Sequence, residues 1–423
     1  MAVFLPLLVL FLAIAVASSA RHPCDFHVAG QCLGDEQDYM QFAQNLSHGF
    51  YANHKSNNPI DYLWFGPGLP LLLTPFVAIG VDEKVLRLSA PLLLFGAVLM
   101  FYALLRLFAG RRMAVAGAYA LGLYWPFWTV ITHIASEPLA ILLVVAALYG
   151  IALHVRSGSR RSLALAAASL GYLALTRIIF GWVIAGVLVV GAVWMVVARR
   201  RGDGAPVPRA AHPARTLVLA CAGALLVCTP WLAYTYSETK RFFLWGNSGG
   251  LQLYWMAPRY AGTVGDWHSP YEVFTSAPLA RHRPFFDHLE TLPPLERDAE
   301  LQRTAIRAIR RRPARYLANV GSNLSRMAFS VPQSFKRRNL RFLFYAVPNS
   351  LLLVCTVLSA GVLFARRRWV RPEIPAFAVL GGVAVMTSAL VAAYPRMLFP
   401  AVPVALAIVI YTAGCHTRFR PPD

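Results

Sequence analysis

The sequence predicts an all-α polytopic membrane protein with about ten transmembrane helices. Of its 423 residues, 57% are hydrophobic and only 14% are charged, whereas about one quarter of a soluble globular domain is charged. Several apolar stretches exceed the roughly 18 residues that can cross a bilayer. The net charge of +21 lies mainly in short arginine runs between these stretches. The positive-inside rule accounts for such runs without a nucleic-acid partner.

The predicted spans and the arginine runs together predict a topology. The spans cover residues 3–20, 85–108, 113–131, 137–154, 162–176, 178–198, 215–236, 342–365, 374–393 and 397–415. The basic groups are Arg111 with Arg112, Arg156 with Arg160 and Arg161, Arg199 to Arg215, Arg366 to Arg371, and Arg418 with Arg420. These spans allow all of the groups, and both termini, to lie in the cytoplasm. The chain then divides into a transmembrane module at 1–236, a large outer loop at 237–341 and C-terminal helices at 342–423.

Two segments near the N-terminus need separate interpretation. Residues 1–20 end in small residues like a signal peptide but lack a basic start, so we expect an uncleaved first helix. Residues 67–80 are apolar but short and rich in proline, which favours an interfacial or re-entrant helix. The alternative is a spanning helix, which would invert the topology of everything upstream.

The two long outer loops, at 21–84 and 237–341, are rich in aromatic residues, so we expect them to fold together into a cap with juxtamembrane helices. A helix predicted over 298–330 has an arginine face and an apolar face. It is expected to lie on the membrane surface, where its arginines meet lipid phosphates. Long loops cross the membrane largely regardless of their charge, so its arginines do not contradict this placement.

Three carboxylates, Asp35, Glu36 and Asp38, follow the first span on the predicted outer side. A structural interpretation is that Asp35 caps the helix predicted from Asp38 to Gly49. A functional interpretation is that a carboxylate at the membrane surface acts as a general base on a hydroxyl or amine.

Other ionisable residues lie at span ends on the same predicted face. Glu137 either supplies a charge favourable to a helix N-terminus before Pro138 or belongs to a site, and His133 precedes it in the same turn. Arg177 and Arg396 either extend toward the interface or bind a phosphate as fork-shaped donors. Cys24 and Cys32 share the first outer loop, and they can pair if that loop lies on the oxidising side.

Taken together, the motifs resemble those of the GT-C class of membrane glycosyltransferases. The likeness is to the bacterial branch of the protein O-mannosyltransferase and aminoarabinose transferase superfamily. The segments that carry it are GDEQDYMQFAQNLSHG (34–49), FGPGLPLLLTPF (65–76), SEPLAILLVVAAL (136–148), TPWLAYTYSETKRFFLWGNSGGLQLYW (229–255) and YPRMLFPAVPVALAIV (394–409). Each motif is weak by itself, whereas their order and common face make the set specific.

The resemblance implies an inverting transferase whose sugar donor is carried on a polyprenyl phosphate. Asp35 matches the family's catalytic carboxylate, and Glu137 matches a second acidic position. Asp38 is an additional carboxylate, so the choice of the base stays open. Arg177 and Arg396 fall where basic residues hold the donor phosphate. The candidate substrate-binding residues are His133, Tyr62, Asn247 and Tyr254.

The expected setting is the bacterial inner membrane, with an envelope lipid, glycan or protein as acceptor. No metal is required, because a monophosphate donor lacks the pyrophosphate that nucleotide sugars chelate. A divalent metal between Asp35 and Asp38 remains compatible with the sequence. A transporter or flippase of a lipid-linked glycan is the main alternative, and a non-catalytic envelope subunit is another. The interiors of the predicted spans are almost free of charge, which favours an enzyme acting at the interface.

Overall fold

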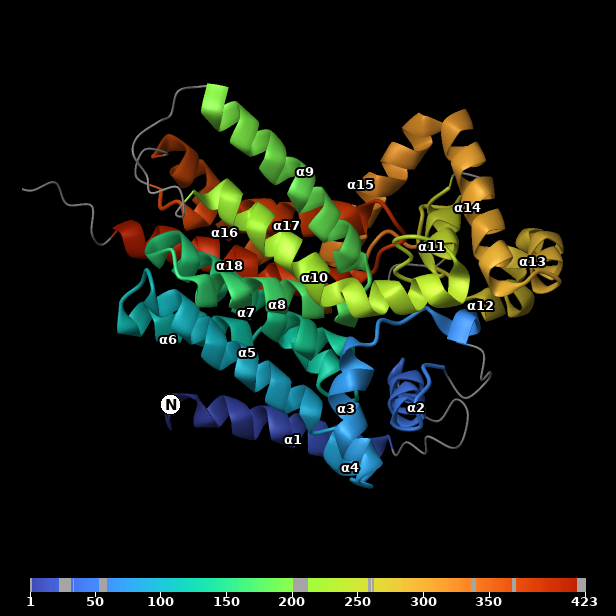
Figure 1. Cartoon of the computed structure of the whole chain (residues 1–423), viewed down its shortest axis with the longest axis horizontal. Coiled ribbons are helices and arrows are strands. Elements are labelled where there is room, and N and C mark those ends of the chain that lie inside the picture. The colour runs from blue at the N-terminus through green and yellow to red at the C-terminus, as the bar shows by residue number, and fades with distance from the viewer. Residues whose placement is uncertain are drawn as a thin grey trace, which may run out of the picture.

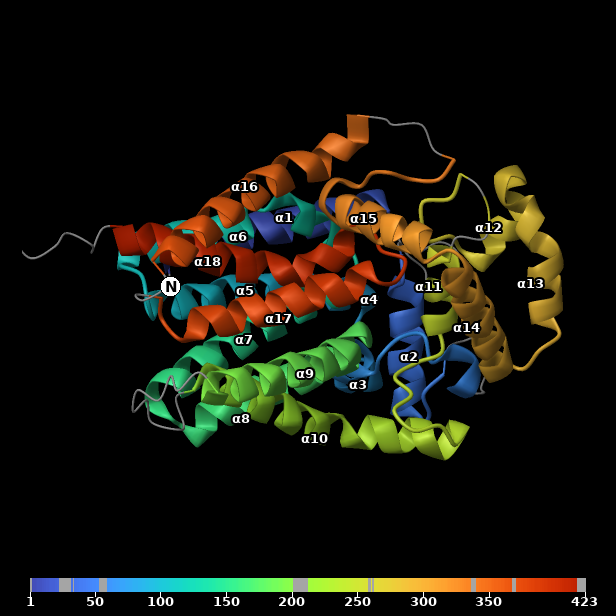
Figure 2. The same ribbon diagram turned by 90° about the horizontal axis from the view of Figure 1, so that it is seen from above.

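A computed structural model describes residues 2–22, 32, 34–52, 59–200, 212–257, 260, 262–335, 340–366 and 370–416. Every element in these ranges is an α-helix or a 3-10 helix. Long helices run side by side as a bundle, and shorter helices gather at one end of it (Figures 1 and 2). The structure thus confirms the predicted all-α class.

The bundle contains the elements that were predicted as spans. They are α1 (Leu5–Arg21), α5 (Ser89–Arg106), α6 (Arg111–Gly122), α7 (Ser136–Ser157), α8 (Arg160–Thr176), α9 (Ile179–Arg200), α10 (Pro213–Thr239), α16 (Leu343–Ala365), α17 (Glu373–Ala389) and α18 (Val402–His416). Within the described ranges, 7 helical stretches are long and apolar enough to cross a membrane. The helices α6, α8 and α17 are shorter, at 12, 17 and 17 residues. The count of about ten spans therefore stays a prediction.

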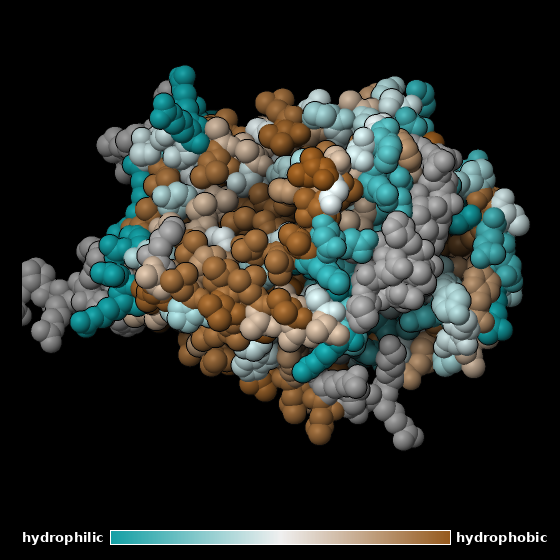
Figure 3. Space-filling view, turned by 90° about the horizontal axis from the view of Figure 1, so that it is seen from below, coloured by the Kyte–Doolittle hydropathy of each residue, from teal (hydrophilic) through white to brown (hydrophobic). Residues whose placement is uncertain are grey.

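The two ends of the bundle differ in the way that the sequence predicts. The N-terminal end of α1 lies at the same end as the arginine-bearing turns α5–α6 and α7–α8 (Figure 1). The helices that lie in the chain between α1 and α5 and between α10 and α16 are at the opposite end (Figure 1). Hydrophobic side chains cover the flank of the bundle, and hydrophilic ones lie at both ends of the molecule (Figure 3). Which end faces the cytoplasm stays a prediction.

The predicted cap exists as a set of short helices. They are α2 (Glu36–Ser47), α3 (Gly68–Ala78), α4 (Glu83–Leu86), α11 (Gly249–Met256), α12 (Pro270–Thr275), α13 (Arg283–Glu290), α14 (Pro294–Arg311) and α15 (Pro313–Phe329). The helix α3 runs across the direction of the bundle helices (Figure 1). Its 11 residues extend about 16 Å, too short for the roughly 30 Å hydrocarbon layer. This geometry agrees with the interfacial helix expected there.

The single helix predicted over 298–330 is wrong, because the structure has two helices, α14 and α15, which meet at an angle (Figure 1). Arg312 leaves the helical conformation, with φ −141° and ψ 61°. Pro313 explains the break, since proline has no N–H to donate and disfavours a helical conformation at the residue before it.

The cap has a hydrophobic core of its own. Tyr254, Trp255 and Met256 of α11 are buried there against Phe286 of α13 and Met327 of α15. The same cluster includes Ala389, the last residue of α17, and Ala392 and Ala393, which follow that helix. The cap is therefore packed onto the segment that joins α17 to the final span.

Candidate functional site

Four residues singled out from the sequence meet at the cap end of the bundle. Asp35 precedes α2, Glu137 lies in the first turn of α7, and Arg177 joins α8 to α9. Arg396 lies in the first turn of the 3-10 helix Pro395–Ala401. They come from four separate parts of the chain, and ion pairs connect them.

Glu137 is the buried centre of this cluster. Its side chain is only 3% exposed, and its Oε1 lies 2.8 Å from Arg177 Nη1 and 3.3 Å from Arg396 Nη1. One carboxylate thereby holds two guanidinium groups side by side. Without it, two positive charges would face each other in a poorly solvated place. Arg177 is 11% exposed, so it does not simply extend toward the solvent interface.

Asp35 lies at the more open side of the cluster. It occupies the N-cap position of α2, but its side chain makes no capping hydrogen bond. Its Oδ2 lies 3.7 Å from Arg396 Nη2, and the side chain is 38% exposed. Surrounding protein desolvates the carboxylate and raises the pKa of Asp35, an effect that Arg396 opposes. The capping interpretation of Asp35 therefore lacks the contact it requires.

A buried tyrosine adds a polar contact that sequence reasoning missed. Tyr39 of α2 is 4% exposed, and burial raises its pKa even though Ser136 hydrogen-bonds to its hydroxyl. Arg177 Nη1 lies 3.4 Å from Ser136 Oγ. The start of α7 thus contacts both α2 and the buried arginine.

The middle carboxylate of the acidic segment has a structural partner. Glu36 is fully buried and accepts two hydrogen bonds from Arg87, at 2.8 Å and 2.9 Å. It also accepts the backbone N–H of Ile134 at 3.0 Å. Through these hydrogen bonds, Glu36 connects the start of α2 to the turn before α7. This connection places Asp35 near Glu137. Sequence reasoning gave Arg87 no role.

Two glycines allow the chain to pass close to the segment that carries Arg177. A Cβ at Gly66 would lie 2.0 Å from Leu175 O, and one at Gly68 would lie 2.7 Å from Thr176 N. Backbone atoms cannot give way as a flexible side chain can, so only glycine fits. The Pro-Gly pattern at 66–68 was noted in the sequence as a motif, but its packing role was not.

The remaining candidates have varied surroundings. His133 is 8% exposed beside Thr132, and burial lowers its pKa. Asn247 joins the two outer loops, because its Nδ2 donates to Ile60 O at 2.7 Å. Tyr254 is 1% exposed, with its hydroxyl 2.8 Å from His282 Nδ1. Their roles in binding substrate stay predictions.

Two predictions involve residues that the structure does not describe in full. Cys32 is disulfide-bonded, whereas Cys24, its predicted partner, and the side chain of Tyr62 lie outside the described residues. Asp38 is half-buried and close enough to raise the pKa of Asp35. In the described part of the chain, no three His, Cys, Asp or Glu side chains lie together as a metal site.

Three solved structures match this chain over almost its whole length. The Archaeoglobus fulgidus oligosaccharyltransferase, tethered with an acceptor peptide containing the NVT sequon, matches with a TM-score of 0.51 and 14% identity, over 96% of this chain and 49% of that one. AglB from the same organism, in complex with an inhibitory peptide and a dolichol-phosphate, matches with a TM-score of 0.49 and 15% identity, over 96% and 50%. ArnT from Cupriavidus metallidurans, bound to undecaprenyl phosphate, matches with a TM-score of 0.41 and 18% identity, over 97% and 78%.

The fold is similar to that of the archaeal oligosaccharyltransferase, which agrees with the GT-C fold that the sequence resemblance implied. The chain spans about half the length of the archaeal oligosaccharyltransferase chains that it matches. No protein-family model matches the sequence, and no curated protein does. At these identities the likeness concerns the fold, so activity is argued from the site.

Proposed function

We propose that this protein is an inverting glycosyltransferase that moves a sugar from a polyprenyl phosphate to an envelope lipid, glycan or protein. The reaction takes place at the outer face of the bacterial inner membrane. The observation that carries the proposal is the position of Arg396, whose guanidinium lies between the buried carboxylate of Glu137 and the half-exposed carboxylate of Asp35. A cation and a base stand side by side at the end of an apolar bundle.

Arg396 suits the phosphate of a lipid-linked donor. Its side chain is 28% exposed, so it is accessible while Glu137 fixes its orientation. A guanidinium has five N–H donors, and only part of them face the two carboxylates. Arg177 adds a second positive charge, because it pairs with the same oxygen of Glu137 as Arg396 does. The pair would stabilise the negative charge that develops on the phosphate as it leaves.

Asp35 suits the general base. The acceptor O–H or N–H attacks the anomeric carbon on the face opposite the phosphate, and the bond from that carbon to the phosphate oxygen breaks. Asp35 takes the proton of the acceptor, and polyprenyl phosphate departs with the electron pair. The raised pKa of Asp35 favours this role, because it makes the carboxylate a stronger base. Asp38 is the alternative base, since it lies within electrostatic range of Asp35.

Mass spectrometry of envelope lipids and glycans tests the proposal in cells. The comparison includes cells without the protein, with the natural protein, with Asp35→Asn and with Asp287→Asn, a matched control at an exposed position on α13. We expect a sugar-sized mass to disappear in the deletion and in Asp35→Asn but to persist in the control. The transferase proposal would be contradicted if the deletion left the set of sugar masses unchanged. If undecorated lipid-linked glycan also stayed on the inner leaflet of the deletion cells, the result would favour a flippase.

A further inference from the structure

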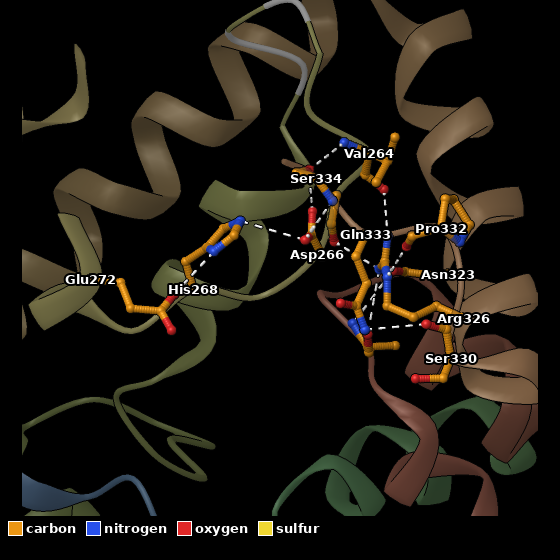
Figure 4. A network of polar contacts seen from close by, with 12 residues as sticks. Val264, Asp266, His268, Glu272, Asn323, Arg326, Ser330, Pro332, Gln333 and Ser334 are labelled. Carbon is orange, nitrogen blue, oxygen red and sulfur yellow. Dashed lines mark hydrogen bonds and ion pairs between the residues drawn. The ribbon is translucent and has the colours of Figure 1, made fainter. Parts of the chain in front are cut away.

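Residues 389–394, called the strap here, connect α17 to Arg396. Side chains of α15 form hydrogen bonds with several residues of the strap. Figure 4 shows the polar network around two of these side chains, Asn323 and Arg326. Asn323 Nδ2 donates to Ala389 O at 3.0 Å and to Val391 O, and its Oδ1 accepts Ala393 N–H at 3.4 Å. Tyr316 Oη donates to Leu390 O at 2.8 Å. The strap therefore takes its conformation from the cap.

Arg326 is the buried cation of this network and is only 2% exposed. It donates to the carbonyl oxygens of Val264 (2.8 Å), Gly265 (3.2 Å), Pro332 (2.8 Å) and Ala393 (3.4 Å), and to the side-chain oxygen of Asn323. None of these acceptors carries a charge. Burial lowers the pKa of Arg326, and the nearby Asp266 opposes this effect. The guanidinium joins two cap loops to the strap at one point.

A buried charge that meets only neutral oxygens is costly compared with apolar packing of similar volume. Its five donors, however, fix several backbone carbonyls in one geometry, which an apolar side chain cannot do. Asp266 anchors one of the loops, because its carboxylate accepts the backbone N–H of Ser334 at 2.8 Å and the hydroxyl of the same residue. Arg326 is thus suited to fixing the position of the backbone segments that it contacts rather than to increasing the stability of the fold.

We propose that Arg326, together with Asn323, is a positioning group for Arg396. It fixes Ala393, three residues before Arg396, so that the guanidinium of Arg396 stays between Glu137 and Asp35 and meets the donor phosphate. The phosphate part of this inference rests on the proposed function. The positioning part rests on the hydrogen bonds to the strap alone.

A double-mutant cycle tests whether Arg326 acts through Arg396. Binding of undecaprenyl phosphate is measured for the purified full-length protein and for Arg326→Gln, Arg396→Gln and the double variant. We expect Arg326→Gln to weaken binding about tenfold, and the double variant to bind no worse than Arg396→Gln. Losses that multiply in the double variant would overturn the proposal, because Arg326 would then act independently of Arg396. Arg303→Gln, on the exposed face of α14, is the matched control and should bind normally.

Two further measurements keep the test decisive. Tyr316→Phe removes only one hydroxyl contact with the strap, so it provides a variant that folds even if Arg326→Gln does not. It should weaken binding less than Arg326→Gln does. Amide exchange across 389–396 needs no donor, and Ala392 and Ala393 should exchange faster in Arg326→Gln and Tyr316→Phe than in Arg303→Gln. Unchanged exchange would overturn the positioning role. A natural protein that binds no undecaprenyl phosphate would contradict the proposed function instead, and exchange would still decide the positioning.

Discussion

At the residue scale, the carboxylate of Asp35 differs from those of Glu36 and Glu137 because it has no close ion-pair partner among the described residues. Glu36 is matched by Arg87, and Glu137 is matched by two arginines. Asp35 stands at an N-cap position without capping, and its one described ion pair has a separation of 3.7 Å. A carboxylate that is poorly matched and beside a cation is available for proton transfer.

We therefore expect Asp35→Asn to lower turnover by about 10²- to 10⁴-fold, the usual contribution of a general base. The amide is similar in size but cannot accept the proton, so binding of the donor should change little. Turnover and donor affinity of the purified protein check this prediction, with Asp287→Asn as the control. A fully active Asp35→Asn protein would transfer the role of base to Asp38.

The raised pKa of Asp35 also predicts how stability depends on pH. A carboxyl whose pKa is raised by folding stabilises the folded state while it is protonated, and this contribution is lost as pH rises through the raised pKa. Near pH 7, Asp35→Asn should therefore melt at a higher temperature than the natural protein. The difference should vanish below about pH 3, where the aspartate is protonated in both states. Thermal melts across this range in detergent check the prediction, and a variant that is less stable near pH 7 would contradict it.

Replacing Glu137 should lower the stability of the protein, whereas replacing Asp35 should raise it. Because its buried carboxylate neutralises Arg177 and Arg396, Glu137→Gln should destabilise the protein by about 3–5 kcal/mol. Undecaprenyl phosphate should restore more stability to this variant than to the natural protein, since its phosphate supplies the missing negative charge. Melts with and without the lipid measure both effects. Glu290→Gln, exposed on α13, is the control, and equal stabilisation of the two proteins would argue against phosphate binding at these arginines.

Sequence reasoning singled out Asp35, Glu137, Arg177 and Arg396, because charged residues at span ends are conspicuous among apolar neighbours. It did not find Arg87 or Tyr39. Arg87 pairs with a carboxylate 51 positions away, and no local pattern encodes such a pairing. Tyr39 lies in the acidic motif 34–49, but its contact with Ser136 depends on how α2 is placed against α7.

At the element scale, the position of Arg177 depends on the close approach of the segment before α3 to the end of α8. We expect Gly68→Ala to destabilise the protein by about 1–3 kcal/mol, because the added methyl group meets backbone atoms of Thr176. Displacement of the α8 end should also weaken binding of undecaprenyl phosphate. Gly382→Ala is the control, since a Cβ there meets nothing within 4 Å. Melting temperature and lipid binding are the measurements, and a Gly68→Ala protein that behaves like the control would refute the role of this contact.

The elements themselves were predictable where apolar length decides them. Each predicted span overlaps an α-helix, because a long apolar segment has few alternatives in a bilayer. The boundaries depended on finer signals. The predicted span 113–131 ends as an α-helix at Gly122 and continues as a 3-10 helix that contains Pro126. Pro313 likewise divides the segment 298–330, for which the pattern of charged and apolar residues predicted one continuous helix.

At the scale of the whole molecule, the site lies where two hydrophobic cores meet. The bundle core contains Phe399 of the segment that follows Arg396, and the cap core contains Ala393 of the strap. Arg396 lies between them, so its position depends on the packing of both. The sequence predicted that a cap exists, but its docking on the strap arises from Asn323 and Arg326, whose contacts with the strap are 66 to 70 positions away in the chain.

The last prediction concerns the orientation of the whole chain. The proposed chemistry requires the cap to face outward, and the arginine-bearing turns then face the cytoplasm. Gln44 is exposed on α2 at the cap end, and Ser157 is exposed in the turn between α7 and α8 at the other end. Ser157 is preferable to its neighbour Gly158, because φ is 66° at that glycine and a side chain there would be strained.

In intact cells, a membrane-impermeant thiol reagent should label Gln44→Cys and spare Ser157→Cys. Permeabilised cells should label both, which shows that the second thiol is accessible. The natural protein provides the background, with Cys221 and Cys228 buried in the bundle. The reverse pattern would place Asp35 and Arg396 on the cytoplasmic side, where an outward-facing lipid-linked donor cannot reach them. It would therefore overturn both the topology and the proposed reaction at the outer face.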